Sequence, residues 1–137
     1  MNRQGTSLWF TVLLGVLIAL PALGTDLYVP ALPGLAQALG AHADAAQLTL
    51  TTYFIGLAAG QLLWGPLSDR FGRKPVLLTG LAVMLVSSVV GYFLTSVMAV
   101  AAVRLAQGLG MSSGSLIGRT IVRDLHSHEQ AAKMLAS

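Results

Sequence analysis

Long apolar segments alternate with short polar ones along the chain, and this pattern predicts membrane-spanning helices. The apolar runs cover residues 8–28, 48–67, 76–94 and 99–118. Each run is close to the roughly 20 residues that a helix needs to cross the hydrocarbon core of a bilayer. A further helix is expected to begin near residue 129, after a polar stretch. The chain is therefore expected to be an all-α membrane protein.

The composition supports the same class. Hydrophobic residues make up 55% of the chain and charged residues 9%, and the mean hydropathy is +0.74. An average soluble domain has about 25% charged residues. The chain has no cysteine, which excludes disulfides and thiol chemistry. The net charge of +3 does not indicate a nucleic-acid partner, because the basic residues punctuate the apolar runs and form no basic face.

The positions of the basic residues predict an orientation in the membrane. With a cytoplasmic N-terminus, seven of the eight Lys and Arg residues fall in inner segments and the outer loops contain none. The inner bases are Arg3, Arg70, Arg73, Lys74, Arg119, Arg123 and Lys133. The eighth base, Arg104, lies within the fourth apolar run. We therefore expect a multi-pass protein of the inner (plasma) membrane with its N-terminus in the cytoplasm.

The stretch GPLSDRFGRKP, residues 65–75, concentrates four charges between two apolar runs. We expect the helix before it to break just before Pro66 and the next helix to begin near Pro75, because proline disrupts a helix interior. An inner loop with basic residues can act simply as a topology anchor. Its residue order is stricter than that role needs, with Gly65, Asp69, Arg70, Gly72, Arg73 and Lys74 at fixed spacing.

This order resembles the signature loop between helices 2 and 3 of the major facilitator superfamily, Gly-x-x-x-Asp-Arg-x-Gly-Arg-Arg/Lys. The stretch RLAQG, residues 104–108, resembles an element in helix 4 of proton-coupled antiporters in that superfamily. The stretch TDLYVPALP, residues 25–33, together with residues 48–75, is similar to the Bcr/CflA drug-resistance branch, which includes chloramphenicol and florfenicol exporters. The resemblance implies a twelve-helix transporter. The chain would then be an N-terminal fragment, a single incomplete transmembrane domain with helices 1–4 and the start of helix 5.

Two charged residues in the apolar runs are the leading candidates for a proton or substrate site. An ionisable group inside a span costs a few kcal/mol and by default indicates function. Asp26 is expected in the outer part of the first helix, where it would bind a proton or a cationic drug, although it could merely cap the helix end. Arg104 is expected at a similar depth, where it would pair with Asp26 or share one aqueous cavity with it. An alternative role for Arg104 is to reach the outer headgroups and anchor its helix.

Weaker candidates for substrate contact are Tyr53, Gln61 and Gln107, each of which could instead hydrogen-bond between helices. The loop charges are expected to gate the transporter. Arg73 is expected to pair with Asp124 on the cytoplasmic side, and Asp69 to accept hydrogen bonds from a nearby helix end. His126, His128 and Glu129 are read as a solvated segment, so no metal site is expected.

These observations favour a proton-coupled drug exporter, truncated here and expected to be inactive alone. Its expected partners are a drug-like substrate, protons, the lipid bilayer and the remaining helices of the transporter. One alternative is a major facilitator transporter of a small metabolite. Another is a small four-helix accessory membrane protein that works as an oligomer. The sequence has no nucleophile–base pair, phosphate-binding loop or metal motif, so neither an enzyme nor a cofactor is expected.

Overall fold

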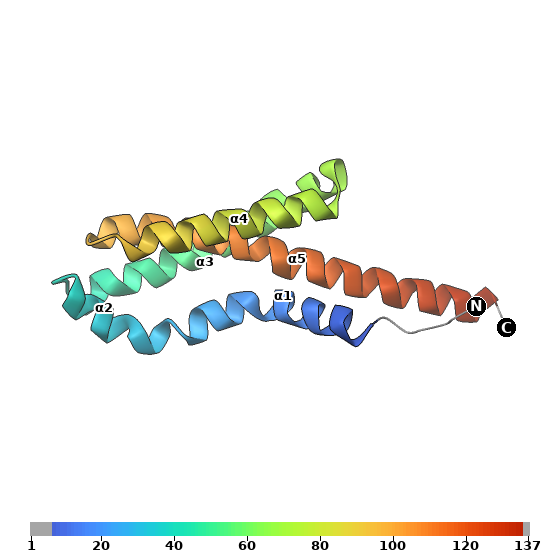
Figure 1. Cartoon of the computed structure of the whole chain (residues 1–137), viewed down its shortest axis with the longest axis horizontal. Coiled ribbons are helices and arrows are strands. Elements are labelled where there is room, and N and C mark those ends of the chain that lie inside the picture. The colour runs from blue at the N-terminus through green and yellow to red at the C-terminus, as the bar shows by residue number, and fades with distance from the viewer. Residues whose placement is uncertain (1–6, 136–137) are drawn as a thin grey trace.

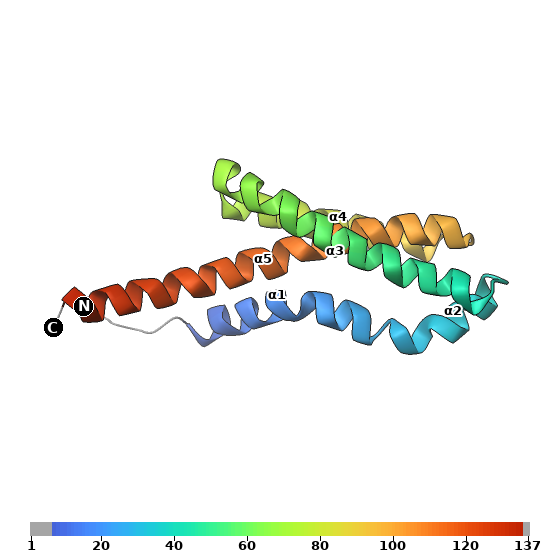
Figure 2. The same cartoon turned by 180° about the vertical axis from the view of Figure 1, so that it is seen from behind.

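The computed structural model describes residues 7–135, and every regular element in that range is helical (Figure 1). The elements are α1 (Leu8–Asp26), the 3-10 helix η1 (Val29–Ala31), α2 (Leu32–Ala38), α3 (Ala43–Phe71), α4 (Arg73–Tyr92) and α5 (Val97–Leu135). The long helices run back and forth along one axis, and α5 extends past the others at the end where the chain begins (Figures 1 and 2). The expected all-α architecture is confirmed.

The first helix ends earlier than its apolar run predicts. Helix α1 stops at Asp26, and the chain turns through Leu27 and Tyr28 into η1 and α2. The prediction of a helix over 8–28 was therefore two residues too long. Pro30 lies four residues after Asp26 and has no backbone N–H, so it cannot donate the α-helical hydrogen bond to the Asp26 carbonyl, and the chain leaves the α1 axis here.

Helices α3 and α4 meet at a single residue, Gly72, which has φ +92°. Glycine is suited to this left-handed conformation because it has no Cβ. The predicted break at Pro66 is wrong, since α3 runs through that proline to Phe71. Gly65 precedes Pro66 and has no Cβ to clash with the proline ring, which removes part of the usual cost. Helix α4 begins before Pro75, because a proline is tolerated in the first turn of a helix.

The predicted helix start near residue 129 is also wrong, because α5 continues from Val97 to Leu135 without a break. Between Gly118 and the end of α5 the sequence contains neither proline nor glycine to interrupt the helix. The polar residues of this stretch therefore do not end the helix, and they belong to the part of α5 that extends beyond its apolar segment. The side chains of residues 129 and 131–134, and all of residues 1–6, which include Arg3, lie outside the described part of the chain.

Helix α5 packs against α1, α3 and α4, and small residues allow the closest approaches. A Cβ added at Gly56 of α3 would overlap the Leu105 backbone carbonyl of α5, and one at Gly108 of α5 would overlap the Tyr53 carbonyl of α3. A Cβ at Gly80 of α4 would overlap the Ser113 hydroxyl. This small-residue packing is typical of helices in membranes.

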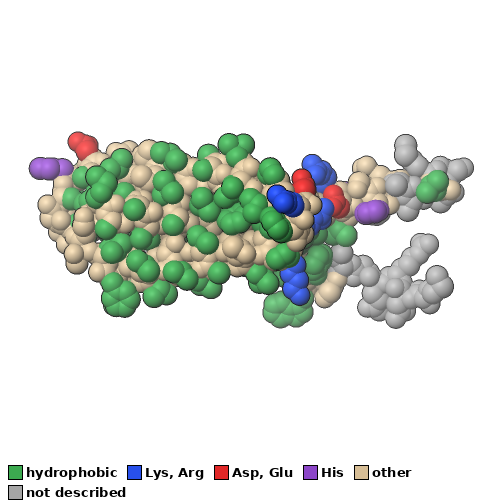
Figure 3. All heavy atoms as spheres, turned by 90° about the horizontal axis from the view of Figure 1, so that it is seen from above, with side chains coloured by type: hydrophobic (Ala, Val, Ile, Leu, Met, Phe, Trp, Pro, Cys, Tyr) green, Lys and Arg blue, Asp and Glu red, His purple; other side chains and the backbone are tan. Residues whose placement is uncertain are grey.

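The distribution of side chains is that of a protein in lipid. Serine and threonine side chains are buried at the helix contacts, with Thr49, Ser112 and Ser113 at 0% exposure. Large apolar side chains cover the outside, including Leu62, Val86 and Tyr92. Figure 3 shows one face with hydrophobic side chains along most of its length and with Lys and Arg gathered toward one end.

Two stretches, Leu8–Ala38 and Arg73–Tyr92, are long and apolar enough to cross a membrane by length and composition. The predicted spans in α3 and α5 do not meet this criterion. Their sequences carry threonines and glutamines in α3, and serines, Arg104 and Gln107 in α5, which lower the mean hydropathy. Many of these polar groups are buried against neighbouring helices, so the polarity of α3 and α5 belongs to the helix contacts.

Candidate functional site

Arg104 is the central residue of the candidate site. It lies on α5 and is only 8% exposed. A charged side chain buried this far needs compensation from its surroundings, because removing a charge from water is costly. The predicted alternative, in which Arg104 reaches out to the headgroups, does not fit this burial.

Two tyrosine rings face the Arg104 guanidinium. Its central carbon lies 3.6 Å from the centroid of the Tyr28 ring and 4.3 Å from that of the Tyr53 ring. Both distances are within the roughly 6 Å that a cation–π interaction requires. Tyr28 comes from the turn after α1 and Tyr53 from α3, so three segments converge on one cation.

Hydrogen bonds tie the same guanidinium to its own helix and to α1. One terminal nitrogen donates to the Gln107 side-chain oxygen at 2.9 Å, and the other donates to the Gly24 carbonyl at 3.4 Å. The Gln107 side-chain amide in turn donates to the Ser88 hydroxyl of α4 at 3.1 Å. Arg104 Nε is buried and has no hydrogen-bond partner among the described residues. Two of the five N–H groups of the guanidinium therefore form hydrogen bonds, and the Nε–H is buried without a partner among the described residues.

Two cavities adjoin this site, and both are lined by Arg104 and Tyr28. The first, of about 530 Å³, lies between α2, α4 and α5 and is also lined by Ser88 and Gln107. The second, of about 440 Å³, lies on the α1 side and is otherwise apolar, apart from Gly24. The guanidinium thus stands between a more polar and a more apolar space. Pockets with a few fixed polar groups in an apolar lining are typical of small-molecule sites.

Asp26 is the last residue of α1 and is exposed, and it forms no ion pair with Arg104. The expectation of a direct pair between these two residues is therefore wrong for this structure. The side chain of Tyr28, two residues on, faces Arg104 in its place. The turn that follows α1 explains the difference, since it directs Tyr28 and not Asp26 toward α5.

The weaker candidates separate into two groups. Gln107 and Tyr53 belong to the Arg104 site: Gln107 accepts a hydrogen bond from Arg104, and the Tyr53 ring faces the guanidinium. The Tyr53 hydroxyl lies 3.1 Å from the Pro21 carbonyl oxygen and 2.9 Å from the Met111 sulfur. Gln61 is exposed on α3 and forms no hydrogen bond within the described range. Two members of the site, Tyr28 and Ser88, were missed by sequence reasoning. The only available signal was the position of Tyr28 in the TDLYVP stretch.

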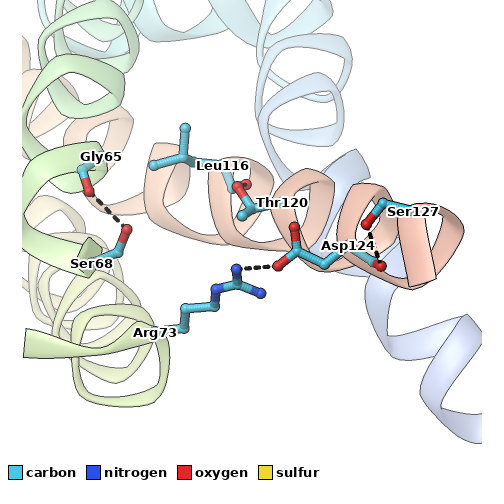
Figure 4. A network of polar contacts seen from close by, with 7 residues as sticks. All are labelled: Gly65, Ser68, Arg73, Leu116, Thr120, Asp124 and Ser127. Atoms are coloured by element: carbon cyan, nitrogen blue, oxygen red, sulfur yellow. Dashed lines mark hydrogen bonds and ion pairs between the residues drawn. The ribbon is translucent and has the colours of Figure 1, made fainter. Parts of the chain in front are cut away.

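A second polar cluster joins the α3–α4 connection to α5. Arg73, the first residue of α4, forms an ion pair with Asp124 of α5, as expected from the sequence (Figure 4). The hydrogen bond from Arg73 lowers the pKa of the Asp124 carboxyl below its ordinary value. Desolvation acts in the opposite direction, and the charges of Arg73, Arg123 and His128 lower the pKa further. Both partners are substantially exposed, at 43% and 39% of the side-chain surface.

The other charged positions of the signature stretch take no part in this ion pair. Asp69, Arg70 and Lys74 are exposed, and the Arg70 guanidinium lies 5.4 Å from the centroid of the Phe71 ring. The expected hydrogen bonds of Asp69 to a helix end are absent from the described residues. The described residues contain no group of three or more His, Cys, Asp or Glu side chains that could hold a metal ion.

Comparison with known proteins identifies the family. The model of the Major Facilitator Superfamily matches residues 12–137. The chain belongs to this superfamily of membrane transporters. The expectation that it is not an enzyme is confirmed by its relatives, which are transporters.

Named relatives are drug-resistance proteins. The chain is 36% identical over its whole length to a bicyclomycin resistance protein homolog of Haemophilus influenzae, of which it covers 34%. It is 44% identical over 85% of its length to a chloramphenicol resistance protein of Pseudomonas aeruginosa, covering 28% of that protein. It is 31% identical over 95% of its length to multidrug resistance protein D of Escherichia coli, covering 33%. The chain thus spans about a third of the length of these relatives. No solved structure matches it.

Proposed function

We propose that the transporter containing this chain exports small drug-like molecules in exchange for protons. The observation that carries the proposal is the buried Arg104, which lines two cavities and whose buried Nε–H has no partner among the described residues. A buried charge inside a membrane span is expensive and by default marks a substrate or ion pathway. The names of the relatives, which refer to resistance to bicyclomycin and chloramphenicol, support a drug as the substrate.

Asp26 is the proposed proton-binding group. It lies at the end of α1, two residues before Tyr28, whose ring contacts Arg104. Protonation removes the negative charge at the end of α1 and changes the electrostatic balance there. That change biases the bundle between its outward-open and inward-open states, because a ligand shifts an equilibrium by its differential affinity for the two states.

The Arg73–Asp124 ion pair is the proposed cytoplasmic latch. It connects the start of α4 to the polar extension of α5, and both side chains are accessible to water. An exposed pair is weak and salt-sensitive, which suits a contact that must open in every transport cycle. The latch holds the inner face closed while the outer face is open.

The proposed topology has the N-terminus in the cytoplasm and the chain in the inner membrane. The beginning of α1, the α3–α4 connection and the extension of α5 lie toward the same end of the bundle (Figures 1 and 2). The described Lys and Arg side chains, other than Arg104, belong to the last two of these regions. This arrangement agrees with a cytoplasmic location of that end, since basic residues are retained inside.

The test uses the complete transporter in a bacterial strain that lacks its own drug exporters. We expect the wild-type protein to raise resistance to chloramphenicol or bicyclomycin and to lower drug accumulation in the cells. Addition of a protonophore is expected to abolish this effect. Efflux that persists with the protonophore would contradict proton coupling. No change in accumulation of either drug would contradict drug export and favour transport of a small metabolite.

A further inference from the structure

We propose that Tyr28 and Tyr53 are positioning residues that hold the Arg104 guanidinium between two aromatic rings, in place of a carboxylate partner. The inference rests on the proposed function, because it specifies how the central cation of that site is held. We refer to Tyr28, Tyr53 and Arg104 as the aromatic clamp.

The geometry of the aromatic clamp is that of a cation–π site. The two ring centroids lie 3.6 Å and 4.3 Å from the guanidinium carbon of Arg104. Cation–π contacts strengthen when the cation is removed from water, and Arg104 is only 8% exposed. The rings come from two different segments, so the clamp also joins the end of α1 to α3 and α5.

Among the described residues, no acid takes the place of the rings. The ion pair between Arg73 and Asp124 is the one that the described residues form, and it lies on the cytoplasmic extension, away from Arg104. The hydrogen bonds of Arg104 go to neutral acceptors, the Gln107 amide oxygen and the Gly24 carbonyl. The aromatic faces therefore supply a large part of the favourable electrostatics for this buried cation.

Each ring is itself held in place through its hydroxyl. The hydroxyl of Tyr28 hydrogen-bonds with that of Thr49 on α3 at 2.6 Å. The hydroxyl of Tyr53 donates to the Pro21 carbonyl of α1, at 3.1 Å, with the Met111 sulfur as a second neighbour. Pro21 is a position where α1 lacks a backbone donor. A movement of the outer part of α1 would therefore move both rings relative to Arg104.

The consequence for function is that the aromatic clamp holds the cation without using the N–H groups in the guanidinium plane. Two of these groups form hydrogen bonds, Nε–H has no partner among the described residues, and Arg104 and Tyr28 line both cavities. With the cation held by ring faces, its remaining N–H groups stay free for an acceptor atom of a substrate. A carboxylate partner would occupy these donors instead, because it binds guanidinium in the plane of the N–H groups.

The experiment separates the ring of Tyr28 from its hydroxyl in the complete transporter. Tyr28→Leu removes the ring, Tyr28→Phe keeps the ring and loses the hydroxyl, and Thr49→Val removes the hydroxyl partner alone. Two properties are measured for each variant. The first is the rate at which phenylglyoxal modifies Arg104, followed by mass spectrometry with Arg119 as internal reference. The second is chloramphenicol efflux, resolved into kcat and KM.

We expect Tyr28→Leu to accelerate modification of Arg104 about fivefold and to lower kcat for efflux about tenfold, because the guanidinium loses a desolvated ring contact. Tyr28→Phe and Thr49→Val retain the ring but lose the hydrogen bond that fixes it, so both variants are expected to lie between the wild type and Tyr28→Leu in both measurements. Modification of Arg119 is expected to be unchanged in all three variants. The tenfold loss corresponds to about 1.4 kcal/mol.

An unchanged rate of Arg104 modification in Tyr28→Leu would overturn the aromatic clamp, as would an equal loss of efflux in Tyr28→Phe and Tyr28→Leu. If Tyr28→Leu does not accumulate in the membrane, Tyr28→Trp replaces it. Because Trp binds cations more strongly than Tyr does, slower modification of Arg104 supports the clamp and faster modification contradicts it. Absence of efflux by the wild type would contradict the proposed function, whereas the modification rates would still decide the clamp.

Discussion

The indole Nε1 of Trp64 on α3 donates a hydrogen bond of 2.7 Å to the backbone carbonyl of Leu109 on α5. Trp64 is 5% exposed and forms the core of the α3–α4–α5 contact with Val76 and Ile117. The Ser112 hydroxyl donates to the same carbonyl at 2.7 Å. The Leu109 carbonyl therefore accepts two side-chain hydrogen bonds, and the one from Trp64 joins α3 to α5.

Replacement of Trp64 separates its hydrogen bond from its packing. Trp64→Phe loses the donor and keeps an aromatic ring, so we expect the free energy of unfolding to fall by about 1 kcal/mol. Trp64→Ala also leaves a cavity, and the expected loss is about 3–5 kcal/mol. Both values are measured by unfolding of the complete transporter in mixed micelles. Equal losses for the two variants would contradict the assignment of packing as the larger effect.

Close packing of α3 on α5 predicts a large difference between two glycine substitutions. A Cβ at Gly56 would overlap the Leu105 carbonyl, whereas a Cβ at Gly15 of α1 meets nothing within 4 Å. We expect Gly56→Ala to destabilise the protein by about 1–3 kcal/mol, as overpacking does. Gly15→Ala, the matched control, is expected to leave the midpoint of thermal unfolding in detergent unchanged or slightly raised. Similar midpoints for the two variants would argue against the close approach of these helices.

Exchange of the two charges tests the cytoplasmic latch. Arg73→Asp and Asp124→Arg each place like charges opposite one another, so each single variant is expected to lower the rate of efflux. The double variant restores the opposite charges in reversed order and is expected to recover most of that rate. The efflux assay is accompanied by a measurement of protein abundance in the membrane. A double variant as inactive as the single variants would count against a direct pair.

The pH dependence of the latch follows from the lowered pKa of Asp124. A carboxyl whose pKa is lower in the folded than in the unfolded state contributes stability above its ordinary pKa, and loses it as the pH falls through the folded value. The ordinary value is 3.8. We therefore expect Asp124→Asn to unfold at a lower temperature than the wild type at neutral pH, with a difference that begins to shrink near about pH 4 and disappears only below the lowered pKa of the folded state. A difference that grows on acidification would contradict this sign.

The sequence was sufficient for those features that depend on composition and local spacing. The apolar runs gave the helical class, and the charged stretch around Gly72 indicated where α3 and α4 meet. Arg73 and Asp124 were expected to pair because both were assigned to the cytoplasmic side. These inferences depend on the side of the membrane on which a segment lies and on the length of its apolar run, and both follow from the residues of that segment alone.

The remaining features depend on how distant helices contact one another. Tyr28 lies beyond the end of α1, and only the turn into η1 brings its ring to Arg104. Pro66 was expected to break a helix because proline generally does so, and this generalisation takes no account of the preceding residue. Here that residue is Gly65, which has no Cβ to clash with the proline ring. Asp26 was expected to pair with Arg104 on the basis of depth alone, and depth does not specify which side of a helix end a side chain occupies.

Proton-driven transport by reconstituted protein tests the central claim most directly. The complete transporter and its Asp26→Asn variant are placed in proteoliposomes with an imposed pH gradient, and chloramphenicol movement is followed together with proton movement. We expect the gradient to drive chloramphenicol against its concentration gradient in the wild type, with protons moving in the opposite direction, and we expect Asp26→Asn to abolish this coupled movement. Coupled transport that is unchanged in Asp26→Asn would contradict the role of Asp26 as the proton-binding group.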